Sequence, residues 1–271
     1  MKPHRTGPAW PLYTALGILG GFYLLLVAGL LLALFFADGL FRPGAALEFL
    51  NTPPIRYALM LTLGSTLLTA MLSVLVAVPV GYLMSRVSFP GKVVVDALLD
   101  VPIVLPPLVV GLALLMLFMT PVGRAIESVV PITYAIPSVV LAQFTVAAAF
   151  AVRLMRSVFE QLDPRCEQVA RTLGCSAGQA FRKVVLPQAA NGMIAAWTLS
   201  WARALGEFGP VLLFAGATRF RTEVLPSTIF LEMSVGNIEG AVAVSVLMVL
   251  VSMTVLILVR LGGVNTRGAS L

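Results

Sequence analysis

Long uncharged runs are the feature that most constrains how this chain can fold. A helix crosses the apolar core of a bilayer with about 20 predominantly apolar residues. Five runs without a charged residue reach that length, namely 6–37, 57–85, 101–123, 128–152 and 240–259. A sixth run, from Val184 into the 210s, is interrupted only by Arg203 and Glu207. The runs predict an all-α integral membrane protein with six transmembrane helices.

The composition supports a membrane location and one domain. Hydrophobic residues make up 59% of the chain and charged residues only 11%, which leaves too little polar surface to cover a soluble globule. The first apolar run is longer than the hydrophobic region of a signal peptide, so we expect it to remain as a span. We therefore expect residues 1–271 to form a single transmembrane domain in the cell membrane.

The distribution of positive charge indicates the orientation. Six spans place both termini on one side, and with cytoplasmic termini that side carries twelve Lys and Arg residues against five on the far side. The five are Arg42, Arg56, Arg124, Arg219 and Arg221. The positive-inside rule favours this topology. The same topology accounts for the net charge of +6. Because no compact basic domain is present, we expect these charges to face the lipid bilayer and not nucleic acid.

The longest cytoplasmic connection, residues 153–189, contains a first short helix. Asp163 and Pro164 are a typical N-cap and first helical residue. An apolar face follows at helical spacing, and Gly174 is a typical C-terminal stop. The residues of that face are Cys166, Val169, Ala170 and Leu173.

A second short helix follows at once. Ser176 and Gln179 have the spacing of a capping box, and we expect Pro187 to end the helix. Its apolar stripe consists of Ala180, Phe181, Val184 and Val185. Two amphipathic helices joined at a glycine can lie on the lipid surface or dock on a partner protein, and length and periodicity do not separate the two.

The identity of the residues in this connection distinguishes between a helix pair on the lipid surface and one that docks on a partner protein. The order Glu167, Ala170, Gly174 and then Leu186-Pro187 resembles the EAA signature of permease subunits of bacterial ABC importers. One departure is that Gln168 and Val169, instead of two alanines, follow the glutamate. The resemblance implies that residues 153–189 are a coupling-helix segment that docks into a cleft of a separate ATPase subunit.

Two further segments narrow the resemblance. "WARALGEFGPVLLFAG" (201–216) and "DVPIVLPPLVVG" (100–111) are similar to permeases for tetrahedral oxyanions, with molybdate or tungstate favoured and sulfate or thiosulfate the alternative. The resemblance implies type I ABC importer architecture. It also implies as partners a second copy of the chain, an ATPase dimer and an extracytoplasmic oxyanion-binding protein.

The chain contains no recognisable catalytic or nucleotide-binding site. Gly91-Lys92 lacks the rest of a phosphate-binding loop, so we expect ATP and Mg²⁺ to bind to the partner ATPase and no cofactor to bind here. The only histidine, His4, stands far from any carboxylate cluster or cysteine pair, and no metal or catalytic set emerges. Both cysteines fall on the cytoplasmic side, where thiols stay reduced. We predict a transport subunit that is not an enzyme.

Charged residues inside the sixth run raise a separate question. Arg203 and Glu207 have i, i+4 spacing and can pair on one helical face. The pair either holds helices together or gives an anion pathway a positive potential. Pro210 withholds a hydrogen bond from the carbonyl of Gly206, so we expect a kink just after the pair.

An ion-coupled secondary transporter is a more distant alternative function, since such proteins carry repeats that are not evident here. A membrane scaffold would leave this segment unexplained.

Overall fold

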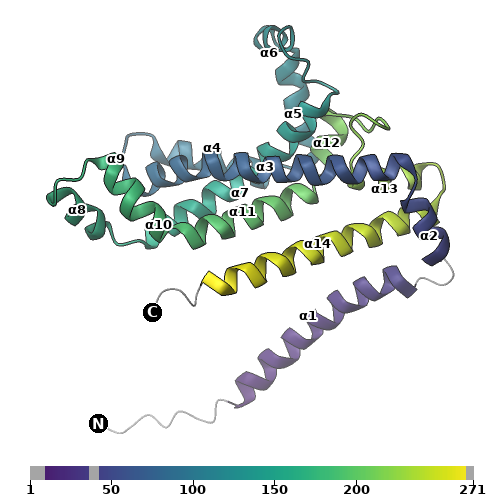
Figure 1. Cartoon of the computed structure of the whole chain (residues 1–271), viewed down its shortest axis with the longest axis horizontal. Coiled ribbons are helices and arrows are strands. Elements are labelled where there is room, and N and C mark those ends of the chain that lie inside the picture. The colour runs from purple at the N-terminus through teal and green to yellow at the C-terminus, as the bar shows by residue number, and fades with distance from the viewer. Residues whose placement is uncertain (1–9, 37–42, 267–271) are drawn as a thin grey trace.

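The computed structural model describes residues 10–36 and 43–266, and every regular element in those ranges is helical. Figure 1 shows a long bundle with a short, roughly perpendicular arm formed by α5 and α6. The elements are α1 (Trp10–Phe36), α2 (Pro43–Leu50), α3 (Pro53–Arg86), α4 (Lys92–Val104), α5 (Pro107–Met119), α6 (Pro121–Glu127), α7 (Ile136–Gln161), α8 (Pro164–Thr172), α9 (Ala177–Ala180), the π-helical turn η1 (Phe181–Val185), α10 (Leu186–Gln188), α11 (Ala190–Leu205), α12 (Gly209–Phe214), α13 (Leu225–Ser234) and α14 (Ile238–Thr266). The predicted all-α class is confirmed.

Four single helices within the described ranges are long and apolar enough to cross a bilayer. They contain the spans Tyr13–Leu34, Pro53–Arg86, Ile136–Gln161 and Ile238–Ile257. A fifth candidate is the α4–α5 pair, which is bent by 113°. The predicted span from Val184 into the 210s is divided into several helices. The count of six spans therefore stays a prediction. The cytoplasmic location of both termini also stays a prediction, and residues 1–9 and 267–271 lie outside the described ranges.

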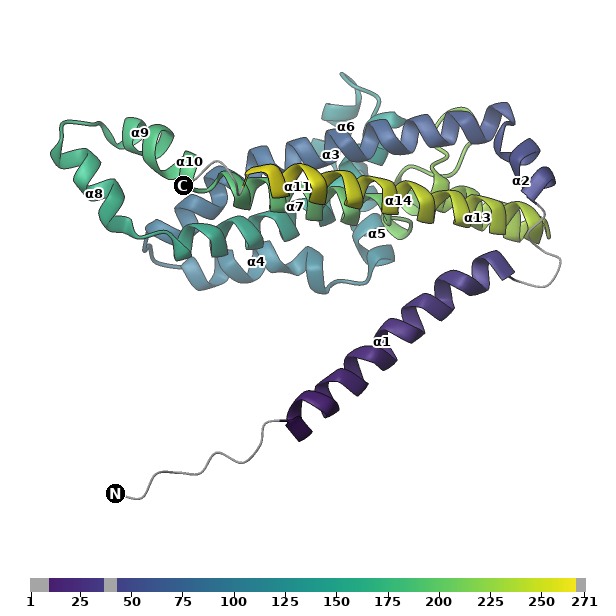
Figure 2. The same cartoon turned by 60° about the horizontal axis from the view of Figure 1, so that its bottom comes forward.

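The centre of the bundle is formed by α3 and α7, with α11 packed against both (Figures 1 and 2). Alanines such as Ala77 and Ala151 are fully buried at this contact. A Cβ on Gly81 would come within 2.8 Å of the backbone nitrogen of Arg156. Small residues let membrane helices approach closely, which strengthens their van der Waals packing. This core fixes the ends of α3 and α7, from which the connection 153–189 projects.

The α4–α5 bend occurs at a pair of prolines, Pro106 and Pro107. α4 ends before Leu105 and α5 begins at Pro107. The bent pair rests against α12, where a Cβ on Gly111 would lie 2.8 Å from Cα of Pro210. A Cβ on Gly209 would lie 3.0 Å from Cβ of Pro107. The two glycines therefore allow α5 and α12 to cross almost backbone to backbone.

The first helix stands apart from this bundle. α1 diverges from α14, the neighbour with which it makes contact, and its most apolar stretch has no buried residue (Figures 1 and 2). The exposed side chains of that stretch are apolar, for example Leu25 and Leu30. An apolar helix surface left uncovered within one protomer requires lipid or another protein chain around it.

Candidate functional site

α8 forms where the local sequence predicts a helix start and stop. Asp163 is the N-cap, and its carboxylate accepts a hydrogen bond from the N–H of Arg165 at 2.9 Å. After the helix, Gly174 has φ +89°, and the N–H of Cys175 donates to the carbonyl of Ala170 at 3.1 Å. Glycine adopts this left-handed conformation without the steric cost that a Cβ imposes. The first predicted helix and its turn at Gly174 are confirmed.

The second helix starts as predicted but does not end at Pro187. The Ser176 hydroxyl accepts from the N–H of Gln179, whose side chain accepts in turn from the N–H of Ser176. The chain then passes through η1, where the N–H of Leu186 bonds to the carbonyl of Phe181, five residues back. This wider turn leaves the proline, which has no N–H, inside a helical path that continues through α10 into α11. Our expectation that Pro187 halts the helix was wrong.

The two short helices differ in what covers their apolar stripes. On α8 only Ala170 is buried, whereas Val169 and Leu173 are 56% and 81% exposed. On the second helix Ala180 and Val185 are buried in the protomer. α8 therefore presents an uncovered apolar face, and the second helix anchors the segment to the bundle.

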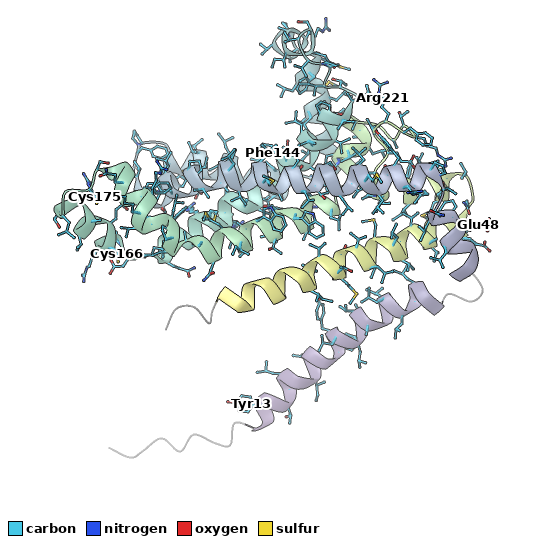
Figure 3. The ribbon with its side chains drawn as sticks, viewed as in Figure 1. Tyr13, Glu48, Phe144, Cys166, Cys175 and Arg221 are labelled. Atoms are coloured by element: carbon cyan, nitrogen blue, oxygen red, sulfur yellow. The ribbon has the colours of Figure 1, made fainter. Side chains whose placement is uncertain are left out.

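The segment occupies one extreme of the molecule. Figure 3 shows Cys166 and Cys175, both free thiols, at one end of the long axis, Glu48 at the opposite end, and Arg221 in the same half of the molecule as Glu48. Glu48 and Arg221 belong to stretches that the charge distribution places on the far side. The predicted topology places the segment 153–189 and these stretches on opposite faces of the membrane, and it stays a prediction.

Glu167 points toward the bundle. Its Oε1 accepts a hydrogen bond from the Tyr82 hydroxyl at 2.6 Å, and its Oε2 lies 4.0 Å from Nε of Arg86. The other residues of the signature differ in how far the protomer covers them. Leu186 is half-buried, whereas Gly174 and Pro187 are exposed. Tyr82 and Arg86 were missed in the sequence, because they precede Glu167 by more than 80 residues and no local pattern connects them.

The ion pair in the divided span forms as predicted. Nη1 of Arg203 lies 2.7 Å from Oε1 of Glu207, and the guanidinium lies over the ring of Phe150 at 5.6 Å from its centroid. The Glu207 side chain is 1% exposed, whereas that of Arg203 is 31% exposed. The carboxylate is thus enclosed by protein, and the arginine is its charged partner at an accessible edge.

The helix breaks earlier than we expected. We predicted a kink after Glu207 caused by Pro210, but α11 ends at Leu205 and Gly206 caps it. α12 then begins at Gly209 with Pro210 in its first turn, where proline is well accommodated. Gly206 and Gly209 weaken the helix on both sides of Glu207, so Glu207 lies within the break and Arg203 lies in the last turn of α11.

Within the described ranges no group of three or more His, Cys, Asp or Glu side chains is placed to hold a metal ion. His4, the only histidine, lies outside those ranges. The segment consists of a projecting helix with an apolar face, and it is joined through the turn at Gly174 and the helical path from Ala177 to Leu205 to a broken span that contains a buried ion pair.

Comparison with known proteins assigns this arrangement to a family. Residues 77–261 match the family described as binding-protein-dependent transport system inner membrane component. The chain belongs to this family. The matched residues begin inside α3 and end in α14, so they include the whole segment 153–189 and the Arg203–Glu207 pair.

Relatives of this inner membrane component extend over most of its length. A probable molybdenum ABC transporter permease protein of Haloferax volcanii is 36% identical over 251 residues, covering 89% of this chain and 90% of that protein. The sulfate transport system permease protein CysT of Salmonella typhimurium is 32% identical and covers 77% and 76%. A crystal structure of a bacterial alginate ABC transporter, in complex with a periplasmic protein bound to an alginate pentasaccharide, shares the fold, with a TM-score of 0.74, 15% identity and 93% of each chain covered.

Proposed function

We propose that this inner membrane component is the permease subunit of an ATP-driven importer of a tetrahedral oxyanion, molybdate or tungstate. It receives the anion from an extracytoplasmic binding protein and releases it into the cytoplasm, where both termini lie. The names of relatives support this anion class, since the Haloferax volcanii protein is described as a probable molybdenum permease. ATP and Mg²⁺ bind to a separate ATPase, and this chain contributes no catalytic residue.

The observation that carries the proposal is the exposed apolar face of α8. Val169 and Leu173 lie uncovered on a helix whose start and turn are fixed by Asp163 and Gly174. Burying such a face releases about 25 cal/mol for each Å² of apolar surface, so a complementary cleft on a partner gains affinity from it. A rigid projecting helix also transmits displacement, which a flexible loop does not.

The helical path after α8 gives that displacement a direction. From Ala177 to Leu205 the chain is helical apart from one turn residue at Ala189, so movement of the segment reaches the break at Gly206. There Glu207 of the ion pair precedes α12 by two residues, and α12 crosses α5 at Gly111 and Gly209. We propose that closure of the ATPase dimer moves α8 and that this movement opens or closes the anion pathway at the break.

Sulfate is the second candidate substrate. The CysT relative is described as a sulfate permease and is nearly as similar in sequence as the molybdenum relative. Molybdate and sulfate are both tetrahedral dianions, so one pathway can pass either, and discrimination then belongs to the binding protein.

Reconstitution with a separate ATPase and binding protein tests the proposal. We expect proteoliposomes to take up radiolabelled molybdate only when ATP, the ATPase and the binding protein are all present. Excess unlabelled tungstate should compete, and sulfate should compete weakly. Uptake driven by an ion gradient without the ATPase would overturn the proposal in favour of a secondary transporter. Stronger competition by sulfate than by tungstate would instead identify the second candidate.

Stoichiometry is a separate prediction. Each chain carries one α8, and an ATPase that closes as a dimer presents two equivalent clefts, so a two-fold assembly is expected. We predict two copies of this 28.8 kDa chain with two ATPase subunits. Native mass spectrometry of the solubilised complex measures this directly. One copy per complex, or a second permease of different sequence, would contradict the prediction.

A further inference from the structure

We infer that Tyr82 is a positioning residue for the coupling segment: its hydroxyl holds Glu167 of α8 against the end of α3, so that α8 and α3 move together. The inference rests on the proposed function, because it concerns how movement of α8 enters the membrane bundle. It assigns to Glu167 a partner inside its own chain.

The bond between Tyr82 and Glu167 is short and involves a charged acceptor. The phenol oxygen lies 2.6 Å from Oε1, and the side chain of Glu167 is only 15% exposed. Hydrogen bonds to an ionised carboxylate are roughly twice as strong as those between neutral groups. A partly buried bond of this kind is well suited to transmit force between two helices.

Arg86 reinforces the same junction one turn further along α3. Its Nη2 donates to the carbonyl of Leu162 at 2.9 Å, and its Nε lies 4.0 Å from Oε2 of Glu167. Leu162 is the residue between α7 and the N-cap of α8. Arg86 therefore holds the point at which the chain enters the coupling segment, and Tyr82 holds the helix itself.

The ring of Tyr82 is fixed by aromatic packing. It meets the ring of Phe159 edge-on with centroids 5.6 Å apart, and the ring of Phe181 at 4.5 Å. Phe159 belongs to α7 and is fully buried, and Phe181 is the first residue of η1. Tyr82 thus contacts α7, α8 and η1 at once, and its hydroxyl has little freedom to follow α8 if the bond to Glu167 breaks.

The two faces of α8 have different partners as a result. Glu167 and Ala170 face the protomer, whereas Val169 and Leu173 face outward. α8 packs chiefly on η1 and α9, so the Glu167 contacts are its polar side-chain links to α3. The outward apolar residues are available to bind the ATPase, and the carboxylate is engaged in passing the movement on.

The substitution Tyr82→Phe tests this inference, because it removes the hydroxyl and keeps the ring. We expect molybdate uptake per ATP hydrolysed in the reconstituted complex to fall roughly tenfold, as for the loss of one hydrogen bond to a charged group. Tyr57→Phe is the matched control: Tyr57 lies at the opposite end of α3, and its hydroxyl donates to the carbonyl of Arg221. That variant should transport with the wild-type ratio.

A double-mutant cycle separates this role from a direct contact between Glu167 and the ATPase. Glu167→Ala should lower the ratio as much as Tyr82→Phe does, and combining the two should add little. Glu167→Gln retains a carbonyl oxygen for the Tyr82 hydroxyl and should recover part of the loss. Wild-type coupling in Tyr82→Phe would overturn the inference, as would additive losses in the double variant.

Failure of this inference is distinguishable from failure of the proposed function. If the wild-type complex shows no ATP-dependent uptake, the proposed function itself is wrong. If the wild type couples uptake to ATP hydrolysis and Glu167→Gln loses ATPase binding while Tyr82→Phe is normal, the carboxylate contacts the ATPase and only the Tyr82 inference falls.

Discussion

Arg203→Ala is expected to lower the yield of folded protein strongly. It leaves the Glu207 carboxylate, which is 1% exposed, without its charged partner. Removing one member of a buried ion pair costs about 3–5 kcal/mol, a large part of the stability of most domains. Glu207→Ala should also lower the yield, because it leaves the guanidinium of Arg203 unpaired in a membrane span. Size-exclusion yield and the thermal melting of the detergent-solubilised protein measure both effects.

The control for this prediction is another pair at the same spacing. Arg156 and Glu160 form an i, i+4 ion pair at 2.8 Å with side chains 29% and 49% exposed. Exposed pairs contribute about 0–1 kcal/mol, and Arg156 keeps its ion pair with Asp96, so Glu160→Ala should leave the yield nearly unchanged. An equal loss of yield in Glu160→Ala and Arg203→Ala would show that burial is not the cause.

The double variant Arg203→Ala/Glu207→Ala then distinguishes the two roles of the pair. Removing both charges leaves no uncompensated ion, so we expect much of the folded yield to return. If Arg203 also contributes positive potential to the anion pathway, uptake per folded complex should recover only in part. We expect this partial recovery. Wild-type uptake per complex in the double variant would restrict the pair to a structural role.

Gly174→Leu is expected to reduce uptake roughly tenfold while the protein still reaches the membrane. A left-handed conformation costs a residue with a Cβ about 1–2 kcal/mol, and here the cost is relieved by opening the turn between α8 and α9. A steric clash of the new side chain is not the cause of the expected loss of uptake, since a Cβ at this position would meet no atom within 4 Å. ATP-dependent uptake and co-purification of the ATPase are the measurements.

Gly178 provides the matched control for this substitution. It lies four residues further on in α9, and a Cβ there also meets nothing within 4 Å, but its backbone is helical. Gly178→Leu adds the same side chain without backbone strain and should transport normally. Gly174→Asn should fall between the two, because asparagine tolerates the left-handed region better than leucine. Normal uptake and ATPase binding in Gly174→Leu would favour the alternative in which α8 lies on the lipid surface.

Local chemistry made much of the candidate site predictable from the sequence. Asp163, Gly174 and the Ser176–Gln179 box act on neighbours within a few residues, so their effect on the backbone follows from residue type and spacing. The pairing of Arg203 with Glu207 follows likewise from helical spacing, although the helix ends between them. The apolar runs determined the all-α membrane class, because a bilayer allows few other ways to satisfy the backbone.

The tertiary structure decided what depends on contacts between distant segments. Pro187 leaves the helix intact because η1 supplies a wider turn, and burial of Val185 and Ala189 holds that turn in the core. The break falls at Gly206, ahead of Pro210, where α12 packs on α5. Tyr82 meets Glu167 across 85 positions of sequence. The sequence alone specified the all-α class, the N-cap at Asp163 and the turn at Gly174. The covered face of α8 and the direction of the Glu167 carboxylate were determined by packing, since only packing brings residues from separate helices within bonding distance.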